Sequence, residues 1–340
     1  MFKGDKSIFC VYLSRYGCLA YTQTMLKTLS DHKIVMIVSE DNAELFQKDH
    51  QVFTLKTASH KAEHLLRSLT IQKQIKEITS KLKNQFQSYE FYFPAFHPWN
   101  LNFLKIAQTD KIDTTLTIHD YKTHIGERSL LIENLQKKMI QKSNRVIFLT
   151  NYVKQQALSE LGTISAYEVV SHPIIKSKAT QNLTHSPTPS LLFLGRGVEY
   201  KGLPLLLSAI ETLPIEKLTI AGKQTVSIPT TNGVTVIDRY LDEKEIGNLL
   251  ASHHILVLPY IEASQSGVLT LGLSAGIPMI ISKVGGLEEQ LPSDAAIWVE
   301  PNEKSLAEGI KRLINDPKTY DDIQVALKNF KHRNTSQERN

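Results

Sequence analysis

Small polar residues and one acid precede a predicted helix near the end of the chain. Glu262 is followed by Ser264, Gln265, Ser266 and Gly267, and then by a run of small and apolar residues. The start of a helix has free N–H groups and the positive end of the helix dipole, and both favour phosphate. A carboxylate beside them can accept hydrogen bonds from sugar or ribose hydroxyls. The stretch therefore has the groups that a sugar-nucleotide site needs.

Two basic residues flank a second loop, which follows the apolar run Leu191–Leu194. Arg196 and Lys201 can both neutralise a diphosphate. The Gly-Arg-Gly sequence suggests a dinucleotide fingerprint, but Tyr200 occupies the position of its third glycine. We interpret the loop as anion-binding, with two solvated surface cations as the alternative.

Two further candidates lie in the first half of the chain. His119 and Asp120 follow the predicted strand Thr114–Ile118. His119 either contacts a donor sugar, with Asp120 orienting its ring, or bonds its own loop as a core residue. Gly17 lies in the turn after the first predicted strand, where such folds hold ligands, and it is a candidate on the acceptor side or a plain turn glycine.

These loops need strands that end at one edge of a sheet. Short apolar runs alternate with helical stretches along the whole chain, which predicts an α/β fold with parallel sheets and helices on both faces. Strands are predicted at Ser7–Leu13, Lys33–Val38, Gln51–Leu55, Phe91–Phe93, Thr114–Ile118, Arg145–Leu149, Tyr167–Val170, Leu191–Leu194, Lys217–Ala221, Val234–Ile237, Ile255–Leu258, Pro278–Ile281 and Ala296–Val299.

The length of 340 residues predicts two domains. Ser171–Ser190 is rich in Pro, Ser and Thr and marks the boundary. We expect an N-terminal domain at 1–172, a linker at 173–189, a C-terminal domain at 190–317, and a C-terminal helix and tail at 318–340.

Charge and composition limit the partners. The net charge is +5, and the first half of the chain is the more basic. The predicted helix Lys61–Lys83 is basic and amphipathic, so it either contacts an anionic membrane or has an ordinary solvated face. No motif predicts nucleic-acid binding.

Two cysteines, Cys10 and Cys18, make neither a disulfide scaffold nor a zinc site and are expected to be packing residues. No apolar run is long enough for a membrane span or signal peptide, so we expect a cytoplasmic protein, with peripheral contact at the inner face of the membrane.

Several motifs together resemble the group 1 retaining glycosyltransferases. They are FLGRGVEYKG at Phe193–Gly202, LTIAGK at Leu218–Lys223, Val257–Ser282, VGGLEE at Val284–Glu289 and, in the first half, TIHDYKTHIG at Thr117–Gly126. The resemblance implies the GT-B fold, in which two Rossmann-like αβα domains face across a cleft that holds the active site.

The resemblance also implies roles. Arg196 and Lys201 would bind the donor diphosphate, and His119 would face the donor sugar. Glu262 would match the first acid of the family's Glu, seven residues, Glu motif, with the amides of Gln265–Val268 near sugar and phosphate and Glu289 in the VGGxxE turn. The second acid of the motif is replaced by Thr270, whose hydroxyl can bond ribose only without charge assistance.

The sequence thus predicts transfer of a sugar from a nucleotide-sugar to a glycan or lipid-linked acceptor, with retention, in bacterial surface polysaccharide synthesis. Because no Asp-x-Asp motif occurs, we expect neither a metal nor a cofactor. A nucleotide-sugar epimerase or phosphorylase on the same fold, or a non-catalytic partner subunit that keeps the fold, is the alternative.

Overall fold

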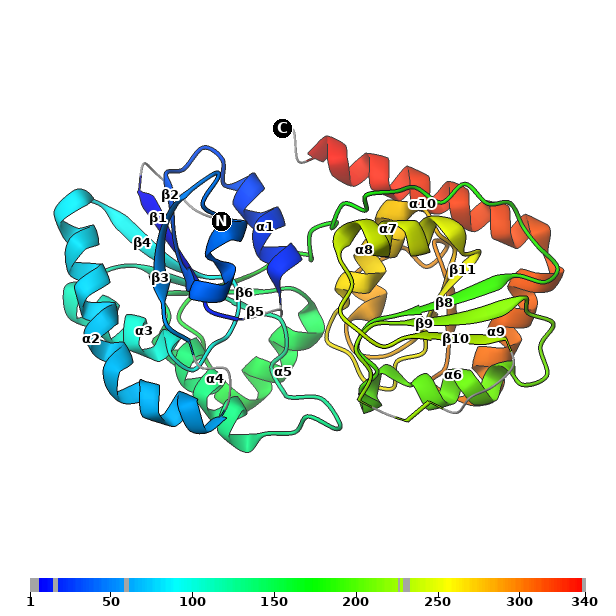
Figure 1. The fold of residues 1–340 in the computed structure, drawn as a ribbon, viewed down its shortest axis with the longest axis horizontal. Coiled ribbons are helices and arrows are strands. Elements are labelled where there is room, and N and C mark those ends of the chain that lie inside the picture. Colours follow the sequence, from blue (N-terminus) through cyan, green and yellow to red (C-terminus); the bar gives the residue numbers. More distant parts are fainter. Residues whose placement is uncertain (1–5, 15–17, 58–60, 226, 229–232, 338–340) are drawn as a thin grey trace. The chain divides into compact units, whose positions relative to one another are not determined.

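The computed structural model describes residues 6–14, 18–57, 61–225, 227–228 and 233–337. The chain forms two compact units. Unit 1 comprises Met1–Lys122 and Ser129–Val170, and unit 2 comprises Thr123–Arg128 and Ser171–Asn340. Each unit has one parallel sheet with helices on both faces (Figure 1). The predicted α/β class is therefore confirmed.

Unit 1 contains a seven-stranded parallel sheet. Its strand order is β3 (Gln51–Leu55), β2 (Ile34–Ser39), β1 (Ser7–Tyr12), β4 (Tyr89–Phe93), β5 (Thr114–Ile118), β6 (Arg145–Phe148) and β7 (Tyr167–Val169). All six pairings are parallel, and in β1, an interior strand, Phe9 lies opposite both Val35 of β2 and Phe91 of β4. Residues of β1 are buried on both faces, which explains why its sequence is almost continuously apolar.

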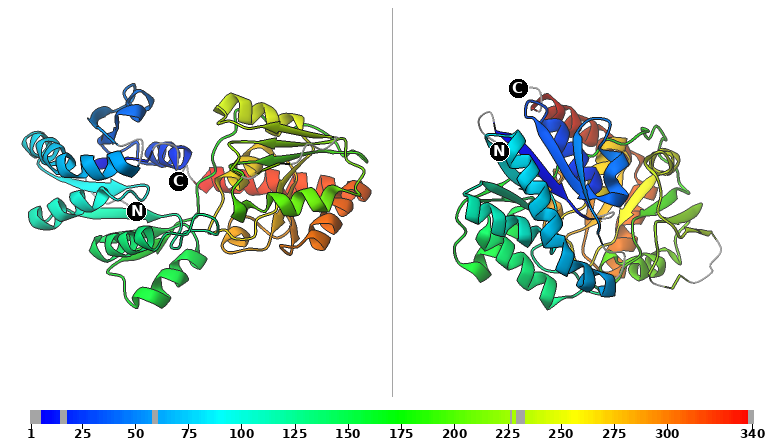
Figure 2. Two further views of the ribbon diagram at one scale, coloured as in Figure 1. Left: turned by 60° about the horizontal axis from the view of Figure 1, so that its bottom comes forward. Right: turned by 60° about the vertical axis from the view of Figure 1, so that its left-hand side comes forward.

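Helices cover the two faces of this sheet. Phe9 and Val11 share a core with α2 (Lys61–Gln85), α3 (Asn100–Asp110), α4 (Leu130–Lys142) and α5 (Asn151–Leu161). Ile8, Cys10 and Tyr12 point to the other face and pack with α1 (Leu19–Thr28) and the short 3₁₀ helix η1 (Glu40–Leu45). The turned views in Figure 2 show this layering.

Unit 2 contains a six-stranded parallel sheet. Its order is β10 (Val234–Ile237), β9 (Lys217–Ala221), β8 (Ser190–Leu194), β11 (Ile255–Leu258), β12 (Met279–Ser282) and β13 (Ile297–Val299). The order of strands along the chain reverses between β8 and β11, which are neighbours in the sheet. Folds of this type bind ligands beyond the carboxyl ends of the strands at such a switch point.

One continuous core joins the helices of unit 2 to its sheet. Helix α6 (Leu203–Ile210) contacts α9 (Glu303–Asn315), and α7 (Glu243–Ser252) contacts α8 (Gly267–Ala275). Helix α10 (Pro317–Gln337) contacts both α8 and α9 and buries Tyr320, Ile323 and Leu327. Helix α10, which corresponds to the predicted C-terminal helix, therefore packs as part of unit 2.

The predicted strands appear with their ends shifted by at most two residues, and the predicted helix Lys61–Lys83 is α2. The predicted first domain at 1–172 differs from unit 1 because Thr123–Arg128 belongs to unit 2. Gly17 lies outside the described residues. Cys10 and Cys18 are free thiols, and burial raises the pKa of Cys18 to about 12. In the described part of the chain, no helix combines the length and the hydropathy needed to cross a bilayer.

Candidate functional site

The loops after β8 and β11 join at the switch point of unit 2. The first loop carries Arg196 and Lys201, and the second carries Glu262, Ser264 and Gln265. Ile261 N donates to Tyr200 O at 2.9 Å and so ties the two loops together. The carboxyl ends of the two adjacent strands thus hold the cations and the acid in one place.

Gly202 permits this close approach. It has a φ of +67°, and a Cβ built on it would lie 1.8 Å from Pro259 O. No side chain fits in that space, and the left-handed backbone also favours glycine. The glycine of the predicted anion loop is therefore required for the loop after β8 to pack on the loop after β11.

Lys201 lies over an aromatic ring. Its Nζ is 3.8 Å from the centroid of the Tyr260 ring and 5.2 Å from that of Tyr200. Cation–π attraction holds an ammonium at such a position. Burial raises the pKa of Tyr260, so the ring stays neutral, and its hydroxyl lies 3.2 Å from Ser266 Oγ. Tyr260 thereby connects the predicted diphosphate cation to the start of α8.

The start of α8 is held in place by side chains. Ser266 is the N-cap, and its Oγ accepts from Leu269 N at 3.3 Å. Gln290 binds the same residue from the far side: Ser266 N donates to Gln290 Oε1 at 2.7 Å, and Gln290 Nε2 donates to Ser266 O at 3.4 Å. The N–H groups of the first turn have no carbonyl partner within a helix, and here they belong to Gly267 and Val268. The predicted phosphate-binding amides are thus on a rigid helix start.

Glu262 receives hydrogen bonds from the segment Thr123–Arg128 of unit 2. Ile125 N donates to Oε2 at 3.1 Å, and Arg128 Nη2 lies 3.2 Å from both carboxylate oxygens. His124 Nδ1 lies 3.5 Å from Oε1. The carboxylate is 21% exposed, so it is oriented by these donors and still accessible to solvent.

Arg196 is paired with the same segment. Its Nη1 donates to Glu127 Oε1 at 2.8 Å and its Nη2 to Oε2 at 3.1 Å. The hydrogen bonds to Glu127 raise the pKa of the Arg196 guanidinium. Both side chains are about half exposed. The two predicted donor-site residues of opposite charge thus both bind Thr123–Arg128.

Thr270 has partners inside unit 2. It is 2% exposed, its hydroxyl donates to Gly267 O at 3.0 Å, and Ile175 N donates to it at 3.5 Å. Intrahelical bonding of this kind is common for Thr. A ribose contact by Thr270 stays a prediction.

The remaining candidates of unit 2 lie around the same loops. Ser264 is buried, and Oε1 of Gln265 is a buried acceptor with no partner among the described residues. Glu289 is exposed in the 3₁₀ helix η3 (Leu287–Glu289), which follows β12. Among the residues described, no group of three His, Cys, Asp or Glu side chains could hold a metal ion.

His119 lies in unit 1, at the carboxyl end of β5. Its ring is 7% exposed and packs edge-on against Tyr21, with centroids 4.6 Å apart. Nε2 donates to Pro94 O at 2.9 Å, since a carbonyl can only accept. Burial lowers the pKa of His119, so the imidazole is neutral and Nδ1 is an acceptor.

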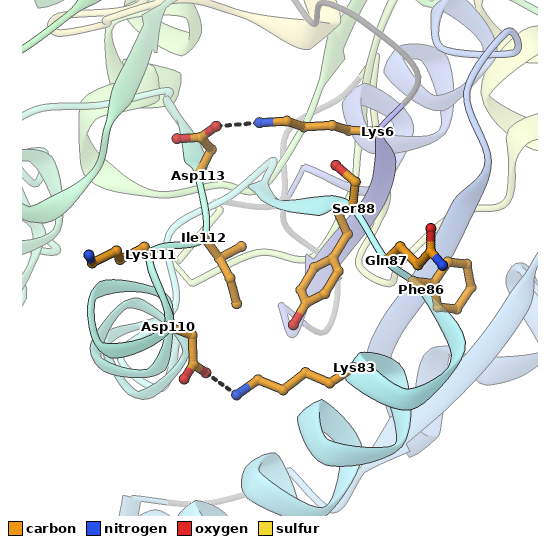
Figure 3. A pocket seen from close by; sticks show the side chains of 10 residues that line it. Lys6, Lys83, Phe86, Gln87, Ser88, Asp110, Lys111, Ile112 and Asp113 are labelled. Carbon is orange, nitrogen blue, oxygen red and sulfur yellow. Dashed lines mark hydrogen bonds and ion pairs between the residues drawn. The ribbon is translucent and has the colours of Figure 1, made fainter.

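A hollow of about 450 Å³ lies at the opposite edge of the sheet of unit 1, beside the amino ends of β1, β4 and β5 (Figure 3). Lys6 pairs with Asp113 and Lys83 pairs with Asp110, each at 2.5 Å. Each carboxylate in the hollow is thus paired with a lysine. None of the predicted site residues lines the hollow.

Three contributors to the site were not predicted from the sequence: Tyr260, Gln290 and the segment Thr123–Arg128. Tyr260 lies two residues after the predicted strand Ile255–Leu258, which was the available signal. Gln290 follows VGGLEE with no distinguishing pattern. The first four residues of Thr123–Arg128 lie in TIHDYKTHIG, a motif of the resemblance, but nothing in the sequence assigns their contacts.

A comparison with known protein families finds a match within unit 2. Residues 188–316 match the family model of the group 1 glycosyl transferases, a range that contains the unit 2 candidates above apart from Thr123–Arg128. One subunit of the phosphatidylinositol N-acetylglucosaminyltransferase of Homo sapiens is 24% identical over 227 residues, which are 61% of this chain and 46% of that protein. The match thus spans about half the length of this relative.

Two solved structures are similar over nearly the whole chain. Sucrose-phosphate synthase of Thermosynechococcus elongatus has a TM-score of 0.73 at 13% identity and covers 95% of this chain and 94% of its own. HepE of Anabaena, in complex with UDP and glucose, has a TM-score of 0.72 at 13% identity, and the match covers 96% of this chain and 94% of the HepE chain. Unit 2 therefore carries a group 1 glycosyltransferase domain, and the chain has the two-domain, Rossmann-like GT-B fold.

Proposed function

We propose that this protein transfers a sugar from a nucleotide-sugar to a hydroxyl of a glycan or lipid-linked acceptor, with retention at the anomeric carbon. The observation that carries the proposal is the switch point of unit 2. There Arg196, Lys201, Glu262 and the start of α8 meet within a group 1 glycosyltransferase domain. An anion site and a sugar-binding carboxylate are the two parts that a nucleotide-sugar requires.

In the proposed reaction the acceptor oxygen forms a bond to the anomeric carbon as the bond from that carbon to the diphosphate breaks. The diphosphate oxygen leaves with the electron pair of the broken bond, and the proton of the acceptor hydroxyl passes to this departing oxygen. Arg196, Lys201 and the amides of Gly267 and Val268 stabilise the developing negative charge without a metal. Glu262 accepts hydrogen bonds from sugar hydroxyls.

His119 is proposed as a contact for the donor sugar. Because burial keeps its imidazole neutral, it would act through the acceptor Nδ1 and not as a cation. A neutral histidine adds no positive charge, which suits a transition state whose sugar ring becomes positive.

The relatives suggest the donor and the acceptor. The human relative is named for N-acetylglucosamine transfer to phosphatidylinositol, and the HepE structure holds UDP and glucose. We therefore propose a UDP-sugar as the donor and a lipid-linked acceptor. Bacterial surface polysaccharide (O-antigen, capsule or exopolysaccharide) is the product class that we propose from the resemblance of the sequence motifs.

Peripheral contact with an anionic membrane is proposed through α2. Lys73, Lys76 and Lys81 are exposed on this helix. Its apolar stripe (Ile71, Ile75, Ile78 and Leu82) is buried in the core of unit 1, so contact would be electrostatic and would not insert the helix. Such contact weakens as salt rises.

Thermal unfolding of the full chain with UDP, GDP, ADP and TDP tests donor binding. A ligand at a hundred times its Kd stabilises the folded state by about 2.7 kcal/mol. We expect UDP to raise Tm most. If no nucleoside diphosphate shifts Tm, the protein is better described as a non-catalytic GT-B protein.

Replacing both cations tests the diphosphate assignment. We expect Arg196→Ala with Lys201→Ala to lower UDP affinity at least about a hundredfold, since hydrogen bonds to charged groups contribute about 1.5–3 kcal/mol each. Isothermal titration calorimetry measures this loss. Normal UDP binding by the double variant would refute the assignment.

Proton NMR of the donor incubated without acceptor separates the enzyme classes. A glycosyltransferase leaves the donor intact or hydrolyses it slowly. Epimerised sugar would indicate a nucleotide-sugar epimerase, and a sugar phosphate formed with added inorganic phosphate would indicate a phosphorylase. The anomeric coupling of an isolated product decides whether configuration is retained.

A further inference from the structure

The charged side chains of Thr123–Arg128 are complementary to those of the candidate donor site. Glu127 binds Arg196, and the next residue, Arg128, binds Glu262. Two adjacent residues of opposite charge in the segment thus each bind a residue of the opposite charge in the candidate site. This pattern places a carboxylate on the guanidinium to which a diphosphate is assigned.

The segment is seated on the loop after β8. The ring of His124 stacks on that of Tyr200, with centroids 4.4 Å apart and an interplanar angle of 28°. Gly126 has a φ of +83°, and a Cβ built on it would lie 3.0 Å from Glu199 Cβ. The backbone therefore approaches the loop closely beside Glu127, which places the carboxylate on Arg196.

The contact between Glu127 and Arg196 has the geometry that a phosphate would use. Both terminal nitrogens of the guanidinium donate, one to each carboxylate oxygen, at 2.8 and 3.1 Å. Arginine binds carboxylates and phosphates through this same two-pronged arrangement. A diphosphate oxygen pair on these two nitrogens would have to replace the carboxylate of Glu127.

We propose that Glu127 is an internal competitor of the donor diphosphate and sets the affinity of the donor site. This inference rests on the proposed function of Arg196. Donor binding exchanges a monoanionic carboxylate for a diphosphate of higher charge on the same guanidinium. Anions must therefore compete with the Glu127 carboxylate for Arg196, which weakens their binding to the site.

The expected effect is modest because the pair is about half exposed. An ion pair at this exposure has an interaction free energy of up to about 1 kcal/mol, and its loss corresponds to about a fivefold change in the Kd for UDP. We expect Glu127→Ala to tighten UDP binding by about fivefold in calorimetry, and Glu127→Gln, which keeps a weaker hydrogen bond, to tighten it by less. Uridine, which has no phosphate to place on Arg196, should bind the wild-type and variant chains equally.

The double variant Glu127→Ala with Arg196→Ala should bind UDP no more tightly than Arg196→Ala alone, since the competitor has lost its target. Glu300→Gln is the control, because Glu300 pairs with Lys283 at 3.8 Å in the same unit and its side chain, like that of Glu127, is exposed to solvent. It should leave the Kd for UDP unchanged.

Two results would overturn the inference. If Glu127→Ala binds UDP equally well or more weakly than the wild type, Glu127 does not compete and instead leaves Arg196 unaffected or positions it. If uridine gains affinity to the same extent as UDP, the effect does not act through Arg196. Failure of the proposed function differs from both, since the wild-type chain would then bind no nucleoside diphosphate.

Discussion

Gln290 is a single buried amide that fixes the start of α8. It is 8% exposed and bonds both the N–H and the C=O of Ser266. We expect Gln290→Met, which keeps the size but removes both hydrogen-bonding groups of the amide, to lower the free energy of unfolding by about 1–3 kcal/mol, because the N–H of Ser266 is left without its partner, whereas Ser266 O keeps the hydrogen bond from Thr270 N. Urea denaturation followed by circular dichroism measures the change.

Glu288 gives the control for this prediction. It is exposed in η3, two residues before Gln290, and Glu288→Met should change stability by less than about 0.5 kcal/mol. Equal stability of the two variants would show that the amide bonds contribute nothing to the helix start.

Charged site residues were predictable from the sequence, but their partners were not. Arg196, Lys201 and Glu262 follow apolar runs, so their places at strand ends could be inferred from local pattern. Their interactions with Glu127 and Arg128 join residues 69 and 134 positions apart along the chain. Contacts at that separation depend on the packed fold, and no local pattern encodes them.

At the scale of elements, the packing of the loop after β8 on the loop after β11 depends on Gly202. In Gly202→Ala the new Cβ would overlap Pro259 O, and the left-handed backbone would add strain. We expect this variant to lose UDP binding more than tenfold, because the loop that carries Lys201 must move away from the loop that carries Glu262. Calorimetry measures the loss, and circular dichroism shows whether the sheet remains.

Gly276 is the matched control for backbone strain. It also has a left-handed backbone, with a φ of +77°, but a Cβ built on it meets no atom within 4 Å. Gly276→Ala should therefore cost about 1–2 kcal/mol of stability and leave the Kd for UDP unchanged. If Gly202→Ala behaves in the same way, the close approach to Pro259 is not needed for the site.

Strands were predicted more fully than helices. Ile255–Leu258 was predicted with the correct ends because it is apolar throughout and Pro259 follows it. Helices α3, α4 and α5 received no bounds from the sequence. In α4 the pattern is misleading, since Leu130 and Leu131 are 78% and 69% exposed while Glu133 and Gln136 are buried. A helix whose polar residues are buried and whose leucines are exposed has no simple apolar stripe.

For the whole molecule, the two-unit organisation followed from the number of alternating elements and from the segment Ser171–Ser190. The boundary between the units falls after Val170. The assignment of Thr123–Arg128 to unit 2 could not be foreseen, because this hexapeptide lies within the strand and helix series of unit 1 and only its tertiary contacts separate it.

The stability of unit 2 should depend on pH through two adjacent histidines. His253 is 2% exposed and lies 2.8 Å from both Thr219 Oγ1 and Leu249 O. Nδ1 of His254 accepts from Ser190 N at 3.1 Å, so it must be unprotonated. Burial lowers the pKa of both residues below their ordinary value of about 6.5.

The sign of the effect follows from proton uptake. Well above pH 6.5 both histidines are neutral in the folded and unfolded chain, and their contribution to stability is complete. As pH falls below about 6.5, the unfolded chain takes up protons that the folded chain does not, so stability is lost until the folded pKa values are reached. Each such histidine contributes at most about 1.4 kcal/mol per pH unit, and the more exposed His254 contributes less.

Trp298 can report on unit 2 by itself. The chain has two tryptophans, of which Trp99 lies in unit 1 and Trp298 packs against the core of unit 2. In a Trp99→Phe background, the urea midpoint followed by Trp298 fluorescence should be lower at pH 5.5 than at pH 7.5. His253→Gln with His254→Asn keeps neutral acceptors at these positions and should remove most of the difference. An unchanged pH dependence in this double variant would show that other groups, and not these histidines, make unit 2 sensitive to acid.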